Sequence, residues 1–101
     1  MQFNEYENLI VNWRIKQGFK TPSNFQDYEQ VLIKLLLIIT EISEAAEAVR
    51  LLDYNNFKEE IADTFIRLFD ITGTMNMDIE KAIKDKMKIN ESREFKHGIL
   101  L

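Results

Sequence analysis

The chain has 101 residues, of which 46% are hydrophobic and 30% are charged. That size and balance are typical of one small folded domain, so we treat residues 1–101 as a single domain with a tail from about residue 94. The sequence contains no cysteine and only one histidine. Disulfides, thiolate zinc sites and cysteine nucleophiles are therefore excluded, and a histidine-rich metal site or a catalytic triad is disfavoured.

The net charge of −4 is unevenly distributed along the chain. Residues 1–80 hold 14 acidic and 7 basic side chains, whereas residues 81–101 hold 3 acidic and 6 basic ones. An acidic body does not suit a nucleic-acid surface, so no nucleic-acid partner is expected. The N-terminus lacks the features of a signal peptide, and no apolar run reaches the roughly 18–20 residues of a membrane span. We therefore expect no membrane partner and a cytoplasmic location, in the host cytoplasm if the source is viral.

Apolar side chains recur every three or four residues, and no stretch alternates as a strand does, which predicts an all-α chain. The expected helices cover residues 4–17, 24–52, 57 to 72 or 75, and 79–92. Gly18 is expected to end the first helix and the stretch 73–77 the third. Ser23, with Gln26 three residues later, fits a capping box for the second helix.

Asn56 and Asp78 are the expected N-caps of the third and fourth helices. The side chains of the fourth helix that we expect to face inward are Ile79, Ala82, Ile83, Met87 and Ile89.

The second predicted helix is apolar on nearly every side around Leu35–Ile39, which indicates burial all round. A chain of this length buries only a modest share of its surface, which suggests an oligomer in which a partner helix covers this one. Trp13, the one tryptophan, has two interpretations. It is either a core anchor of the first helix or a stacking surface for a nucleobase.

Two pairs of carboxylates suggest a metal site. Glu41 and Glu44 are three residues apart within the apolar helix, and Glu60 and Asp63 repeat that spacing on the next helix, so each pair shares a helix face. Buried carboxylates without partners cost several kcal/mol, and a divalent cation that prefers oxygen ligands, such as Mg²⁺, would offset several at once. With the helix ends given above, the two pairs are offset by roughly one to two turns.

The alternative is a set of solvated helix faces with salt-bridge partners. Lys34, Arg50 and Arg67 are the available cations under that interpretation. Arg67, four residues after Asp63, would either orient a carboxylate or neutralise it. Glu47 and Glu59 are expected to be ordinary solvated residues.

The basic end offers a possible phosphate clamp. Lys86, Asn90 and Arg93 share a helix face, and Lys96 and His97 follow. Lysine and arginine can hold phosphate oxygens, arginine in a bidentate manner. A solvated amphipathic face is the alternative.

These motifs together resemble the MazG-like nucleoside triphosphate pyrophosphohydrolases of the all-α NTP pyrophosphatase superfamily. The resemblance rests on Thr40-Glu41-Ile42-Ser43-Glu44, on Glu60-Ile61-Ala62-Asp63, and on the late segment with Lys86, Asn90, Arg93 and His97-Gly98. It covers roughly residues 30–98. Thr40 stands where many relatives have a first Glu, and Ile89 where a Lys often precedes the Asn.

The resemblance implies a four-helix MazG-like bundle completed by oligomerisation, in a homodimer or a dimer of dimers. It also implies hydrolysis of an NTP or dNTP between the α and β phosphates, with Mg²⁺, or Mn²⁺ in its place, as cofactor. The family pattern places the metal ligands and the catalytic centre at Glu41, Glu44, Glu60 and Asp63. Substrate contacts are then expected from Lys86, Asn90, Arg93 and Lys96, with Trp13 as a candidate for the base.

Two rival functions follow from the same residues. One is a phosphoribosyl-ATP pyrophosphohydrolase, which has the same chemistry and a larger substrate. The other is a helical interaction module without enzymatic activity, in which the acidic pairs serve solubility alone.

Overall fold

The computed structural model describes residues 2–18 and 25–93, which contain four α-helices and no strand. The helices are α1 (Phe3–Lys16), α2 (Tyr28–Arg50), α3 (Tyr54–Thr74) and α4 (Ile79–Ser92). The prediction of an all-α chain with four helices is confirmed. Within the described ranges no helix is long and apolar enough to cross a membrane.

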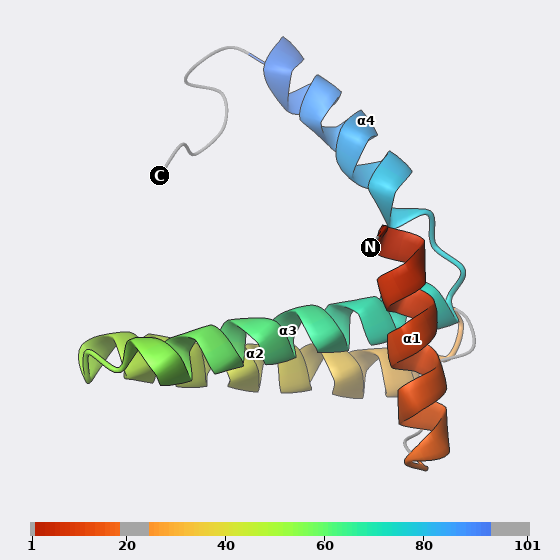
Figure 1. Cartoon of the computed structure of the whole chain (residues 1–101). Coiled ribbons are helices and arrows are strands. Elements are labelled where there is room, and N and C mark those ends of the chain that lie inside the picture. Colours follow the sequence, from red (N-terminus) through yellow and green to blue (C-terminus); the bar gives the residue numbers. More distant parts are fainter. Residues whose placement is uncertain (1, 19–24, 94–101) are drawn as a thin grey trace.

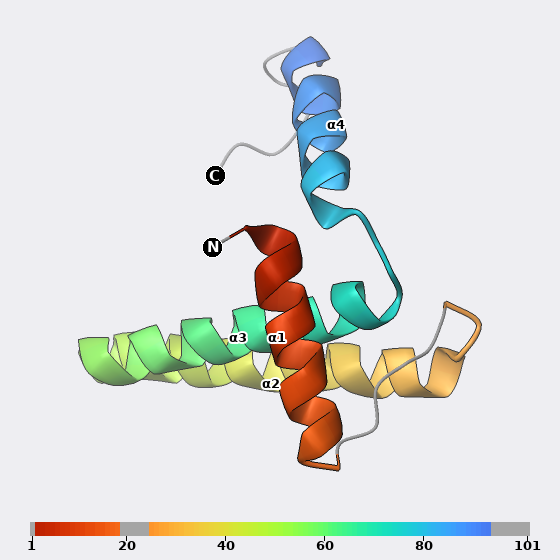
Figure 2. The same cartoon turned by 45° about the vertical axis from the view of Figure 1, so that its right-hand side comes forward.

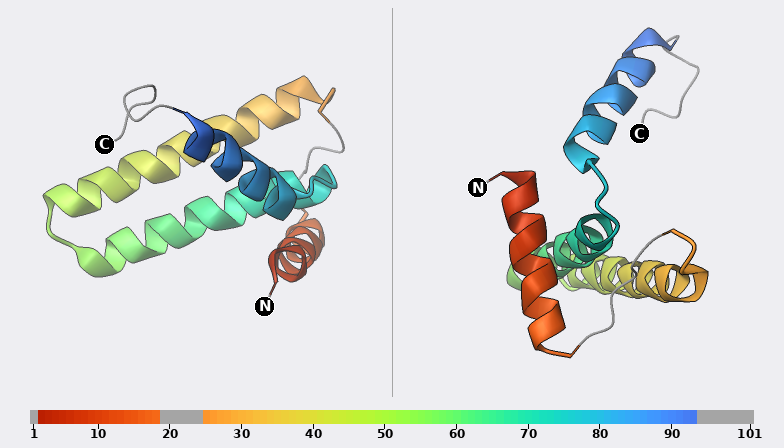
Figure 3. Two further views of the ribbon diagram at one scale, coloured as in Figure 1. Left: turned by 90° about the horizontal axis from the view of Figure 1, so that it is seen from above. Right: turned by 90° about the vertical axis from the view of Figure 1, so that its right-hand side faces the viewer.

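The α2 and α3 helices lie side by side as an antiparallel hairpin, and α1 crosses the end of α3 that is far from the hairpin turn (Figure 1). The fourth helix leaves the end of α3 and extends away from the other three (Figure 2). Views from above and from the side show the same arrangement (Figure 3). The body of the molecule is therefore made of three packed helices.

A tight closure at the hairpin turn sets where α2 and α3 end and begin. Leu52 adopts a left-handed conformation with φ of 57° and donates its N–H to the Val49 carbonyl at 3.0 Å. Asp53 donates its N–H to the Ala48 carbonyl at 2.9 Å, which completes a Schellman motif. The predicted end of the second helix at residue 52 is therefore wrong by two residues.

The N-cap of α3 also differs from the prediction. The Asp53 side chain accepts a hydrogen bond from the Asn56 N–H at 3.1 Å, so Asp53, and not Asn56, is the cap. The third helix accordingly begins at Tyr54, three residues earlier than expected.

The other helix ends agree in part with the sequence analysis. Gly18, with φ of 84°, follows the end of α1 as predicted. The Asp78 carboxylate accepts from the Lys81 N–H at 3.1 Å and caps α4 as predicted. The second helix begins at Tyr28 after Asp27, later than expected, and Ser23 lies outside the described residues.

The third helix ends within the stretch 73–77, as predicted, although Gly73 itself lies inside the helix. The helix continues to Thr74, and Asn76 provides the left-handed residue that stops it. A Cβ atom at Gly73 would lie 2.9 Å from Val11 Cγ2 and 3.1 Å from Glu7 Cβ. Gly73 therefore allows α1 to pack closely against α3.

The buried apolar core of the described chain is small and consists of Val31, Ile38, Ala45, Ala48 and Ile71. Much of α2 stays exposed, so its predicted burial on every side is not met within one chain. The large exposed side chains of α2 include Leu32, Leu35, Leu36, Ile39, Ile42 and Val49.

Two further predictions of burial fail within the single chain. Trp13 is 49% exposed and does not act as a core anchor. No residue of α4 is buried. Of the side chains predicted to face inward, Ile79 is partly buried and the others are exposed, namely Ala82, Ile83, Met87 and Ile89. The sequence pattern identified the apolar face of α4 but not what covers it.

Candidate metal site between α2 and α3

The two carboxylate pairs lie at the same level of the hairpin. Glu44 is six residues before the end of α2 at Arg50, and Glu60 is six residues after the start of α3 at Tyr54. Glu41 and Asp63 are each nine residues from the same two ends. The predicted offset of one to two turns is therefore wrong, because it came from misplaced helix ends.

Three of the four carboxylates converge closely. Glu41, Glu60 and Asp63 each offer a carboxylate oxygen, and these oxygens lie within 4.8 Å of one another. Glu41 and Glu60 are partly buried and Asp63 is exposed. Two neighbouring helices thus present oxygen atoms to a common point that is open to solvent on one side.

Glu44 belongs to the same cluster through Glu60. The pKa of Glu60 is raised to about 7, first because protonated Glu60 hydrogen-bonds to Glu41 and to Glu44. Desolvation and then repulsion from the same two carboxylates raise it further. The Glu60 Oε2 atom is shielded from solvent and has no hydrogen-bond partner. The cluster therefore holds more negative charge than its protein partners neutralise.

Arg67 is the cation that reaches this cluster. Its Nε lies 3.0 Å from Glu41 Oε1, and the two side chains are 24% and 13% exposed. Arg67 thus pairs across the hairpin with Glu41 instead of with Asp63 on its own helix. Glu44, Glu60 and Asp63 have no ion pair with a lysine or arginine among residues 2–18 and 25–93.

A second charged cluster, which the sequence analysis missed, joins three helices. Asp70 on α3 is fully buried, with Arg14 Nε of α1 at 2.9 Å and Lys34 Nζ of α2 at 3.9 Å from its Oδ2. Burial raises the pKa of Asp70, and the charges of Arg14 and Lys34 oppose that rise. Burial, followed by repulsion from Arg14, lowers the pKa of Lys34. Charged residues inside the apolar stretches around positions 34 and 70 were the available signal.

Glu47 and Glu59 behave as expected. Glu47 is exposed and pairs with Arg50 at 3.1 Å on its own helix. Glu59 is exposed as well. Both are ordinary solvated side chains. Within residues 2–18 and 25–93, Lys34 and Arg50 form no ion pair with the four clustered carboxylates.

The predicted phosphate contacts are not brought to the carboxylates within one chain. Lys86 and Asn90 are exposed on α4, and Arg93 is its C-cap, while α4 extends away from the hairpin (Figure 1). Lys96 and His97 lie outside the described residues. Trp13 lies on α1, which crosses α3 away from the half that carries Glu60 and Asp63.

The chain gives no match to any protein-family model, to any curated protein or to any solved structure. The structure itself defines an all-α protein with a cluster of four carboxylates on a helical hairpin.

Proposed function

We propose that the protein is a Mg²⁺-dependent nucleoside triphosphate pyrophosphohydrolase that converts an NTP or dNTP into the monophosphate and pyrophosphate. The observation that carries this proposal is the gathering of Glu41, Glu44, Glu60 and Asp63 at one level between α2 and α3. The resemblance of these residues to the MazG-like motif supplies the reaction. A cytoplasmic nucleotide pool is the proposed source of substrate.

The donor atoms fit a divalent cation that prefers oxygen. Glu41, Glu60 and Asp63 offer carboxylate oxygens within 4.8 Å of one another. Glu60 also has an oxygen that is shielded from solvent and has no hydrogen-bond partner. Mg²⁺ takes few carboxylates and keeps waters and substrate phosphates in its shell, which suits a cluster open on one side. Mn²⁺ is the expected substitute.

The residues of the hairpin would have distinct roles. A bound Mg²⁺ would polarise a phosphate oxygen and lower the pKa of a water. Glu41, Glu44, Glu60 and Asp63 would hold the ion, and Arg67 would fix the orientation of Glu41 through their 3.0 Å ion pair. In the metal-free cluster the pKa of Glu60 is about 7, so binding of the ion would compete with a proton on Glu60 close to neutral pH.

The phosphates would be held by the basic end of the chain. Lys86, Asn90, Arg93 and Lys96 supply the donors that phosphate oxygens need. Since α4 points away from its own hairpin, these residues would come from another subunit of a homodimer or a dimer of dimers. The exposed apolar side chains of α2 would supply the area for such an assembly.

Product analysis tests the proposal directly. The purified protein is incubated with Mg²⁺ and each common NTP and dNTP, and the monophosphate and pyrophosphate are measured. We expect release of pyrophosphate that is lost in Glu41→Gln and in Asp63→Asn and retained in Glu47→Gln. Glu47 is the matched control because it lies on α2 but pairs with Arg50 in solvent. Activity that survives the first two substitutions would refute the site.

A further inference from the structure

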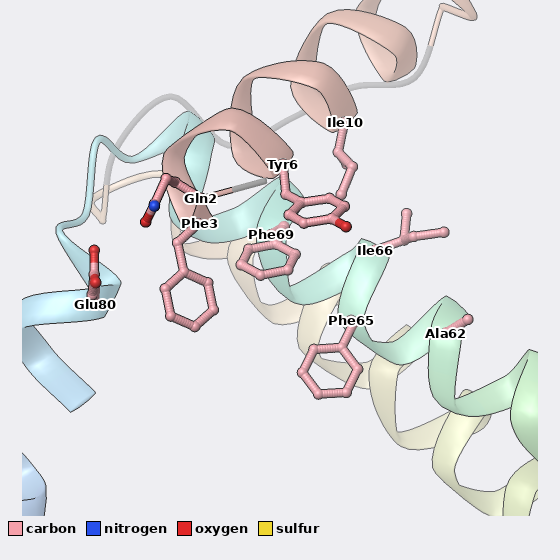
Figure 4. Close-up of a pocket in the computed structure, with 9 residues that line it drawn as sticks. All are labelled: Gln2, Phe3, Tyr6, Ile10, Ala62, Phe65, Ile66, Phe69 and Glu80. Carbon is pink, nitrogen blue, oxygen red and sulfur yellow. The ribbon is translucent and has the colours of Figure 1, made fainter. Parts of the chain in front are cut away.

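An apolar groove lies between α1 and α3, on the side where α4 begins. It has a volume of about 510 Å³ and is open to solvent. Figure 4 shows its main apolar walls, which are formed by Phe3, Tyr6 and Ile10 of α1 and by Phe65, Ile66 and Phe69 of α3. The polar side chains of Gln2 and Glu80 stand at one end of it.

The aromatic rings give this groove a fixed shape. The Phe69 ring lies at centroid distances of 5.7 Å from Phe3 and 6.2 Å from Tyr6, and it is stacked with Tyr6. Phe65, at 6.4 Å from Phe69, is nevertheless 55% exposed. Aromatic surface of this extent is costly to leave in water, so the groove needs an occupant.

The fourth helix carries a matching apolar face that the described chain leaves exposed beyond Ile79. Ile79, Ala82, Ile83 and Met87 follow the spacing of three and four residues that one helix face requires. None of them is buried, and Met87 is 56% exposed. An isolated helix of 14 residues is marginal in water, so α4 itself needs a partner surface.

The connection between α3 and α4 holds the helix away from the groove of its own chain. Met77 donates its N–H to the Thr72 carbonyl at 2.9 Å, which closes α3 with Asn76 in the left-handed conformation. The Asp78 carboxylate then accepts from the Lys81 N–H at 3.1 Å and starts α4. Both helix ends are capped within a few residues, and α4 runs outward from the end of the groove (Figure 1).

We propose that the α1–α3 groove is the docking site for α4 of a second copy of this chain. The α3 wall from Ala62 to Phe69 spans about 10 Å and the apolar face of α4 from Ile79 to Met87 about 12 Å, at 1.5 Å per residue. Such a face seated in such a groove is the helix-in-groove mode of recognition. The exchange is reciprocal, so a two-fold dimer fills both grooves.

The charges favour the same arrangement. Residues 79–93 carry five basic and three acidic side chains, whereas residues 1–78 carry 13 acidic and 7 basic ones. A basic helix is thus attracted to an acidic body, which speeds correct encounter. This interface does not depend on the proposed enzymatic function.

Cysteine pairing tests which chain supplies the helix, because the sequence has no cysteine of its own. Phe65→Cys and Ile83→Cys are made in separate chains, which are then mixed and oxidised. We expect a disulfide-linked dimer of one chain of each kind. In the control, Leu9→Cys replaces Phe65→Cys, because Leu9 is similarly exposed but does not line the groove. This control should give much less of the disulfide-linked dimer.

The doubly substituted chain separates the two possible arrangements. A disulfide within one chain would overturn the proposal, because α4 would then occupy the groove of its own chain. The absence of any cross-link, with a monomer in sedimentation, would overturn it as well. Phe65→Glu and Met87→Glu should each shift a dimer toward monomer, while Leu9→Glu should not. A dimer unaffected by both would also contradict it.

Discussion

Glu44 on α2 and Glu60 on α3 stand six residues from their respective ends of the hairpin turn, so the two side chains face each other across the helix pair. The hydrogen bond that Glu60 makes to Glu44 when protonated is one of the two largest causes of its raised pKa. The fold therefore holds Glu60 beside carboxylates that raise its pKa, against their mutual repulsion. This relationship leads to the first two predictions.

The stability of the metal-free protein should fall as the pH rises toward neutrality. The pKa of Glu60 is about 7 in the folded chain and 4.5 when unperturbed. A raised pKa stabilises the folded state fully below the unfolded value, and this contribution is lost as the pH rises through the folded value. Urea unfolding in the presence of EDTA, from about pH 5 to about pH 8, should show this component.

Glu60→Gln should remove that component, since glutamine does not titrate. The free energy of unfolding is compared between variant and wild type at each pH, so that the contributions of the other carboxylates cancel. Glu47→Gln, at an exposed site, should leave the pH dependence unchanged. A wild-type protein that gains stability relative to Glu60→Gln between pH 5 and 7 would contradict the assignment.

Mg²⁺ should stabilise the folded chain, and the acidic cluster should determine how much. A ligand at a hundredfold its Kd adds about 2.7 kcal/mol to the free energy of unfolding. Asp63→Asn should raise stability in EDTA, because it relieves repulsion, and should abolish most of the gain from Mg²⁺. Asp85→Asn, where the carboxylate pairs with Lys81 in solvent, should change neither. Equal gains in all three proteins would indicate a general effect of salt.

Asp70 should be the most sensitive charged position in the chain. Asp70→Asn removes the buried carboxylate that pairs with Arg14 and Lys34, and breaking a buried pair in this way costs about 3–5 kcal/mol. Lys34→Met should be far milder, because Arg14 still lies 2.9 Å from Asp70 and one buried charge is removed. Urea unfolding measures both. Similar large losses in the two variants would show that Lys34 is required as the partner of Asp70.

Leu52→Gly should stabilise the hairpin turn. Leucine at φ of 57° costs about 1–2 kcal/mol, and glycine removes that cost but loses more entropy on folding. The expected net gain is about 0.5–1 kcal/mol, read from thermal or urea unfolding. Leu51→Gly is the matched control, because φ is −89° there and the substitution should destabilise. Within this chain the Leu52 side chain is 91% exposed. A loss of stability at both positions would therefore show that this side chain makes its contacts with another chain.

The sequence predicted the kind of fold well and its helix ends less well, for identifiable reasons. Asp53 and Asn56 are both good N-caps, so the sequence could not decide between them. Leu52 in a left-handed conformation carries no signal, because leucine rarely adopts it. The misplaced end of the second helix and start of the third account for the predicted offset between the carboxylate pairs, which the structure does not show.

Burial was harder to predict than helicity. The apolar face of α4 was visible in its spacing, but periodicity does not tell which surface covers a face. Asp70 and Lys34 could have been found by the reasoning applied to Glu41, since each is a charge within an apolar stretch. The position of Arg14 on a distant helix could not have been inferred from spacing.

Release of pyrophosphate is the measurement that tests the central claim most directly. The protein is given Mg²⁺ and a panel of NTPs and dNTPs, and the products are separated. We predict equal amounts of monophosphate and pyrophosphate, lost in Glu41→Gln and Asp63→Asn and retained in Glu47→Gln. No turnover of any nucleotide would contradict the proposed function. Release of orthophosphate and the nucleoside diphosphate, in place of the monophosphate and pyrophosphate, would contradict it as well.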